Sequence, residues 1–228
     1  MRVGSLAQDI VTVPLALALV ALSALFLTRR SAKVFIAMIG LVGYLFYGYG
    51  LYAMQGQYTS IYLAYLLVFA LSIYGLVYGL SSFNPVAVNQ TTLPKSTRLA
   101  AAVFLASILV VLIPVWLMLL IPTIEAHKPM DTYGVFVLDL AVVFPALAIV
   151  MWMLFRNRPY GNVFAGVALF KAFTVCLSVA FGEWFAAFYG GIGANYGSLA
   201  LFGVLTFASG VLFVLYSRNL SFHPVQKV

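Results

Sequence analysis

The chain has 228 residues, of which 64% are hydrophobic and 7% are charged, with a mean hydropathy of +1.09. Soluble globular domains carry about 25% charged residues, so this composition excludes one. The net charge of +7 does not indicate nucleic-acid binding, because the basic residues form short clusters between apolar runs. We predict a single integral membrane domain over residues 1–228 that has the lipid bilayer as its surroundings and no nucleic-acid partner.

Apolar runs long enough to cross a bilayer follow one another along the whole chain. A bilayer core about 30 Å thick requires about 20 apolar residues per helix. The first run is expected to be a retained helix rather than a signal peptide, since Arg29 and Arg30 follow it. The prediction is an all-α bundle of seven transmembrane helices, at about 10–28, 34–54, 60–80, 99–122, 133–155, 161–182 and 197–216.

The basic residues predict how the chain is threaded. With seven spans, every Lys and Arg except Arg2, Lys128 and Lys171 falls on one side of the membrane. The positive-inside rule therefore places the N-terminus outside and the C-terminus in the cytoplasm, in the cell (plasma) membrane.

Two of the connections between spans are long enough for their composition to predict their structure. Residues 81–97 contain two prolines among Asn, Thr and Ser, which is typical of a hydrated loop without fixed structure. Residues 183–197 interleave aromatic residues with glycines, which predicts a short helix at the membrane interface followed by a glycine turn.

Two ionisable residues, Asp139 and Lys171, lie inside apolar runs. A charge in the hydrocarbon core costs roughly 2.5 to 3.5 kcal/mol on insertion scales, so such residues usually face a cavity, a partner or a pathway. Three interpretations stay open: a structural clamp between helices five and six, a site for a proton, ion or zwitterionic or anionic solute, or two residues that do not pair. By spacing, Thr174 and Ser178 share the helix side of Lys171 and are expected at the same site.

Tyrosines are dense in the second and third spans. Those near the span ends are most simply explained as interfacial residues. Tyr44, Tyr47, Tyr65 and Tyr74 lie deeper, and a buried hydroxyl requires a hydrogen-bond partner, so these four are candidate cavity-lining residues.

The remaining small residues, prolines and cysteine favour packing over cofactor chemistry. Gly40 and Gly43 allow close helix approach, and no basic residue accompanies them as a phosphate site would require. Pro145 can kink the fifth span beside Asp139. The single Cys176 excludes an internal disulfide and a multi-cysteine metal site, so no cofactor or metal is predicted.

A sequence pattern runs through these same residues. The stretch from Phe136 to Ala141 (FVLDLA), then Pro145, the turn 156–161 (RNRPYG) and Lys171, resembles a group of multi-pass prokaryotic membrane proteins of uncharacterised function. The resemblance covers helices two to six. It implies that Asp139, Pro145, the basic turn and Lys171 form one module, and it implies no activity.

We predict transport or conduction of a small solute or ion through a polar site between helices five and six. The main alternative is a non-catalytic sensor or accessory subunit, with the charge pair as a clamp and with a second copy or another membrane subunit as partner. An enzyme ranks third, because no catalytic motif is present and it would need an outer pocket that combines Asp131, Glu183 and His127.

Overall fold

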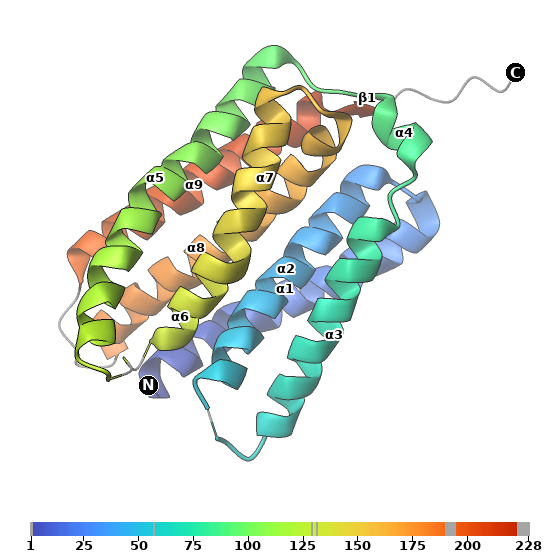
Figure 1. The fold of residues 1–228 in the computed structure, drawn as a ribbon. Helices are drawn as coiled ribbons and strands as arrows, with labels where there is room; N and C mark the ends of the chain where they lie inside the picture. Colours follow the sequence, from blue (N-terminus) through green and yellow to red (C-terminus); the bar gives the residue numbers. More distant parts are fainter. Residues whose placement is uncertain (1, 57, 129, 131, 190–194, 223–228) are drawn as a thin grey trace, which may run out of the picture.

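The computed structural model describes residues 2–56, 58–128, 130, 132–189 and 195–222, which are almost wholly helical (Figure 1). Within these residues, seven helices are long and apolar enough to cross a membrane, and each matches one predicted span, so the all-α class and the seven candidate spans are confirmed. Helices satisfy all their backbone hydrogen bonds internally, as the hydrocarbon core requires. In chain order they are α1 (Arg2–Arg29), α2 (Ala32–Met54), α3 (Tyr62–Ser81), α5 (Lys95–Glu125), α6 (Tyr133–Leu138) continued by η1 (Asp139–Val143) and α7 (Phe144–Phe155), α8 (Pro159–Tyr189) and α9 (Tyr196–Asn219).

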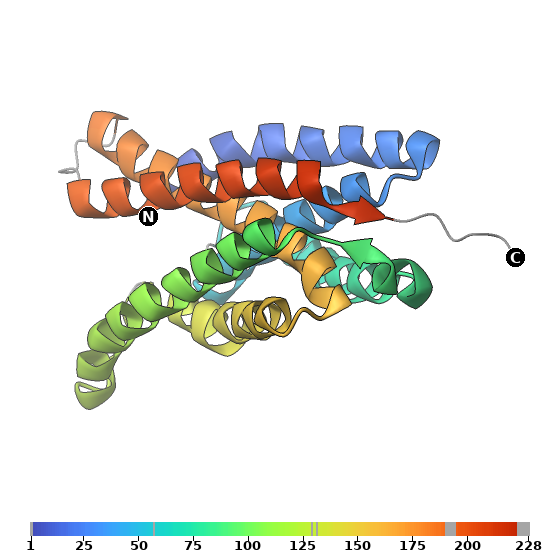
Figure 2. The ribbon, with the colours of Figure 1, turned by 90° about the horizontal axis from the view of Figure 1, so that it is seen from above.

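Helix α8 is the centre of the bundle. It contacts α1, α2, α7 and α9, whereas α3 packs mainly on α2. Figure 2 shows α8 running between α1 and α9 on one side and α5, α6 and α7 on the other. In the apolar stretch of α8, 61% of the residues are buried, against 6% in the corresponding stretch of α9, so α8 is the helix on which an interior site depends.

The two ends of the bundle differ in packing. We call the end with the helix termini Arg29, Ser81, Phe155 and Asn219 the sheet end, and the opposite end, where α6 and α9 begin, the open end. Helices α5 and α9 lie close together at the sheet end and diverge toward the open end (Figure 2). The described basic clusters lie at the sheet end, as the predicted threading requires.

The prediction of an unstructured loop over residues 81–97 is wrong. Asn84 caps a short helix, α4 (Pro85–Asn89), by accepting a hydrogen bond from the Val86 N–H at 2.9 Å. The chain then forms strand β1 (Thr91–Thr92), which pairs antiparallel with β2 (Ser221–Phe222) after α9. Because this pairing joins distant segments, the local Pro and Asn pattern could not predict it.

The helix predicted after residue 182 is not a separate one, because α8 continues without a break to Tyr189. Aromatic side chains one turn apart stack along this extension: Phe181 on Phe185 with ring centroids 5.8 Å apart, and Phe185 on Tyr189 at 4.9 Å. These i, i+4 contacts stabilise helix beyond the apolar run. The predicted glycine turn at 190–194 lies outside the described residues.

Candidate functional site

A change in helix type begins at Asp139. Residues Asp139–Val143 form a π-helical turn, η1, and the Phe144 N–H donates to the Asp139 carbonyl five residues earlier instead of four. Pro145 follows directly and has no N–H to offer the Ala141 carbonyl. π-Turns are rare and occur frequently at functional sites, so this turn directs attention to the Asp139 side chain.

The Asp139 carboxylate is buried and receives two hydrogen bonds from other helices. On α2, the Tyr47 hydroxyl donates to Oδ2 at 3.2 Å, and on α5 the Trp116 Nε1–H donates to the same oxygen at 2.7 Å. Donors of this kind stabilise an ionised acceptor more than a neutral one. Among the described residues, no hydrogen bond reaches Oδ1.

Lys171 lies over the face of the same Tyr47 ring whose hydroxyl bonds Asp139. Its Nζ is 4.6 Å from the Tyr47 ring centroid, a cation–π distance. Its stem passes α2 at Gly43, where a Cβ would lie 3.1 Å from Lys171 Cγ, so the glycine makes room for the lysine. Within the described part of the chain, Nζ has no hydrogen bond and no carboxylate oxygen within 4.0 Å. Asp139 and Lys171 therefore interact through space without a contact ion pair, and both contact Tyr47, Asp139 at its hydroxyl and Lys171 at its ring.

Both charges line one cavity of about 360 Å³, which we call the interhelical cavity. It reaches Thr132 and Ser198 at the open end, and its floor toward the sheet end is formed by Ile108 and Leu147. Most of its wall is apolar. Its polar groups lie in two places: Tyr47, Asp139, Lys171 and Cys176 deep inside, and Thr132, Glu183 and Ser198 near the open end.

A polar contact closes part of the open end between α8 and α9. The Ser198 hydroxyl donates to Glu183 Oε1 at 3.0 Å. The third interpretation of the sequence, an enzyme, requires a pocket that combines Glu183 with His127 and Asp131. His127 does not line the interhelical cavity, and Asp131 lies outside the described residues.

Two predicted site residues on α8 do not face this cavity. Thr174 is fully buried, and its hydroxyl donates to the carbonyls of Phe170 and Lys171 at 3.0 and 3.1 Å, within its own helix. Ser178 instead accepts from the Tyr44 hydroxyl at 3.5 Å. Tyr44 also lies 2.8 Å from Thr12 Oγ1, so these hydroxyls form a separate network between α1, α2 and α8.

The other two candidate tyrosines lie away from the interhelical cavity. The Tyr65 ring packs on Tyr52, with centroids 4.9 Å apart, and on Tyr49 at 5.6 Å. Tyr74 is 73% exposed on the outer face of α3, where it meets lipid in a bilayer. Of the four predicted tyrosines, Tyr47 alone contacts the two buried charges.

The sequence interpretation overlooked two residues. Trp116 contacts Asp139, although the only local signal is its position two residues after Pro114 in an apolar run. Asp9 lies inside the first membrane-spanning helix, and the Tyr52 hydroxyl donates to its Oδ1 at 3.4 Å. The predicted span begins one residue later, at about residue 10, and therefore leaves Asp9 outside it.

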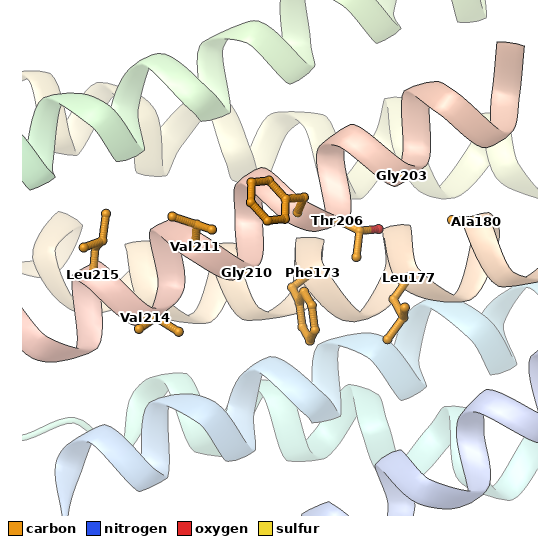
Figure 3. Close-up of a pocket in the computed structure, with 10 residues that line it drawn as sticks. Phe173, Leu177, Ala180, Gly203, Thr206, Gly210, Val211, Val214 and Leu215 are labelled. Carbon is orange, nitrogen blue, oxygen red and sulfur yellow. The ribbon is translucent and has the colours of Figure 1, made fainter.

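A second hollow lies on the outside of the bundle between α8 and α9, and we call it the surface groove. Figure 3 shows Phe173 and Leu177 of α8 along it, beside Val211, Val214 and Leu215 of α9. Its volume is about 610 Å³, but its only side-chain polar group is the Thr206 hydroxyl, which donates to the Phe202 carbonyl at 2.7 Å. The surface groove is larger than the interhelical cavity but carries no group for solute chemistry.

The arrangement in the interhelical cavity can hold a molecule with both polar and apolar parts between two fixed charges. Comparison of the chain with protein-family models, curated proteins and solved structures gives no match, so its resemblance to the uncharacterised prokaryotic group stays a prediction.

Proposed function

We propose that this multi-pass membrane protein transports a small solute or ion, which binds in the interhelical cavity between α6–α7 and α8. The observation that carries the proposal is that Asp139 and Lys171 line one cavity without forming a contact ion pair. We further propose that the basic sheet end faces the cytoplasm, so that the cavity is reached from outside the cell.

The geometry supports a binding site more than a clamp. A clamp gains from a close, fully hydrogen-bonded ion pair, since otherwise the cost of desolvating two charges exceeds their attraction. Here Asp139 is held by Tyr47 and Trp116, whereas Lys171 has only the Tyr47 ring as a described polar partner. An ammonium that lines a cavity without a hydrogen bond is available to a solute.

The cavity is closed on the side of the sheet end. Below its floor, side chains that are 0% exposed fill the bundle between α5, α7 and α8, among them Leu105, Leu154, Val163 and Leu169. Transport therefore requires a second state in which this packing opens. The π-turn and Pro145 lie at the level of the cavity, where the backbone hydrogen bonding of the span is interrupted, and are the expected hinge.

A cysteine at the cavity floor tests whether the second state exists. In a Cys176→Ala background, Leu147→Cys is treated with a charged, membrane-impermeant methanethiosulfonate reagent in sealed vesicles of either orientation. Transport predicts labelling from both sides, because the floor faces each side in turn. Ile149→Cys, on the exposed face of the same helix, is the matched control and should react from neither side.

The alternative is a sensor or accessory subunit that binds its ligand from one side only. The close packing below Leu147 favours this alternative, since nothing in it marks a second entrance. A sensor predicts that Leu147→Cys reacts from the open end alone. That result, with Ile149→Cys unlabelled, would refute transport and leave binding in place.

A further inference from the structure

The chemistry of the cavity wall narrows the solute that it can accept. We propose that the ligand of the interhelical cavity is an organic anion with an apolar body, such as a medium-chain carboxylate, whose carboxylate binds Lys171. This inference rests on the proposed function for the position of the site, but it concerns binding and not movement.

The apolar wall argues for an apolar body. Between the deep charges and the open end, the cavity is lined by side chains such as Leu51, Leu119, Val135 and Phe202. A hydrated inorganic ion loses water along such a wall without gaining ligands in exchange. An alkyl or aryl group instead moves from water or lipid into contact with an apolar wall. Most small-molecule sites, with volumes of about 300–1,000 Å³, are likewise lined mainly by apolar side chains.

The two buried charges differ in their hydrogen-bond partners, and this difference favours a ligand with an anionic head group. Asp139 receives hydrogen bonds from Tyr47 and Trp116, so its carboxyl has partners within the protein without help from a ligand. Lys171 has three N–H donors and no described acceptor. A carboxylate bound to Nζ supplies the missing acceptors, whereas an ammonium head would face Lys171 as a like charge.

The other charged or titratable groups of the cavity fit this assignment. On α8, Glu183 lies near the open end and is held by Ser198, and Cys176 is a thiol. The cavity-lining residues of α5 and α9 include no charged residue. An anion that enters therefore meets Lys171 as the one cation of the described lining, whereas Asp139 is bonded to the Tyr47 hydroxyl and the Trp116 indole.

Trp116 provides a reporter inside the cavity. The chain has three tryptophans, and Trp152 and Trp184 are 50% and 39% exposed. The double variant Trp152→Phe, Trp184→Phe leaves Trp116 as the only indole. A bromine atom close to an indole quenches its fluorescence, so 2-bromodecanoate, with bromine next to the carboxylate, reports binding in the interhelical cavity that Trp116 and Lys171 line.

The experiment titrates this Trp116 reporter in lipid nanodiscs with 2-bromodecanoate, 2-bromodecan-1-ol and 2-bromopropanoate. We expect saturable quenching by 2-bromodecanoate that decanoate reverses and decanol does not, with the bromo-alcohol about tenfold weaker or more, as loss of a charged hydrogen bond implies. A reporter with Trp152 alone, made by Trp116→Phe and Trp184→Phe, should show only the non-saturating quenching of probe dissolved in the bilayer.

The second part of the experiment removes the Lys171 ammonium. Lys171→Met should weaken 2-bromodecanoate about tenfold or more. Lys33→Met should not, because Lys33 donates to the Ser217 carbonyl outside the cavity and controls for loss of one positive charge. The competition by decanoate and decanol uses no charge variant, so it decides the head group even if Lys171→Met does not fold.

Each outcome has a distinct meaning. Equal binding of the bromo-alcohol and the bromo-acid overturns the anionic head, equal binding of 2-bromopropanoate overturns the apolar body, and absence of saturable quenching overturns both. If 2-bromodecanoate binds while Leu147→Cys is labelled from one side only, this inference stands and transport fails. If labelling occurs from both sides without saturable quenching, transport stands and this inference fails.

Discussion

The hydrogen bond from Trp116 to Asp139 gives the sharpest test of the site geometry. At 2.7 Å it is at the short end of charge-assisted N–H···O distances, and it joins α5 to the π-turn. Trp116→Phe keeps an aromatic ring but removes the donor. In water-soluble proteins a hydrogen bond to a charged group contributes about 1.5–3 kcal/mol, and in membrane proteins measured bonds reach about 1.7 kcal/mol, so we expect a bond contribution near 1.5–2 kcal/mol.

A double-mutant cycle separates this bond from the smaller size of phenylalanine. In an Asp139→Asn background the acceptor is a neutral amide oxygen, for which the bond contributes about 0.5–1.5 kcal/mol. The cavity left by the indole is the same in both backgrounds and cancels. We therefore expect Trp116→Phe to lower the free energy of unfolding by about 1 kcal/mol more beside Asp139 than beside the asparagine.

The assay is equilibrium unfolding in mixed micelles with increasing dodecyl sulfate, followed by far-ultraviolet circular dichroism. Trp152→Phe, at a half-exposed position on α7, is the control and should change the free energy by less than about 0.5 kcal/mol. Equal losses in the two backgrounds, within about 0.5 kcal/mol, would show that Trp116 does not stabilise a charged Asp139 and would refute the reasoning.

Two further predictions concern the packing of α8 at the sheet end, both measured by the same unfolding assay. Tyr216→Phe should lower the free energy of unfolding by about 1–2 kcal/mol, because the buried hydroxyl donates to the Asn162 carbonyl at 2.7 Å. The exposed Tyr74→Phe is the control, and an equal decrease for the two variants would contradict this prediction. Gly166→Ala should lower the free energy of unfolding by about 1–3 kcal/mol, since its Cβ would collide with the Tyr216 ring and lie 2.6 Å from Ile36 Cγ2, whereas Gly203→Ala meets no atom within 4 Å and should be neutral or stabilising. Equal effects of the two alanines would mean that α2 and α9 do not approach α8 this closely.

Hydropathy predicted the spans but not how they pack. In a bilayer, lipid-facing and buried residues are equally apolar, so the contrast that marks the core of a soluble protein is missing. Tyr47 and Tyr74 have the same sequence character, yet one is 8% exposed beside Asp139 and the other is 73% exposed on the outer face of α3. Only the packing of α2 against α8 distinguishes them.

The candidate site was predicted where a single residue carried the signal, and not where it depended on contacts between helices. A charge in an apolar run is visible in the sequence, and so Asp139 and Lys171 were identified. Trp116 was not, because an apolar run accepts tryptophan for many reasons, and its bond to Asp139 spans 23 positions. Thr174 follows Lys171 at i+3, but a hydroxyl on a helix often bonds its own backbone, as this one does.

The π-turn explains why helical periodicity counted from Asp139 would mislead. In an α-helix, residues three or four apart share a face, so Asp139 would be followed on the buried side by Val142 or Val143. In the structure the next buried position is Phe144, five residues on, and Leu147 then follows at the ordinary spacing. The extra residue in the turn thus brings Asp139 into phase with Phe144 and Leu147 on one side of the span. Without it, a straight helix that kept Phe144 and Leu147 buried would rotate Asp139 away from Tyr47 and Trp116, so the local cost of the turn is what places the carboxylate in the interhelical cavity.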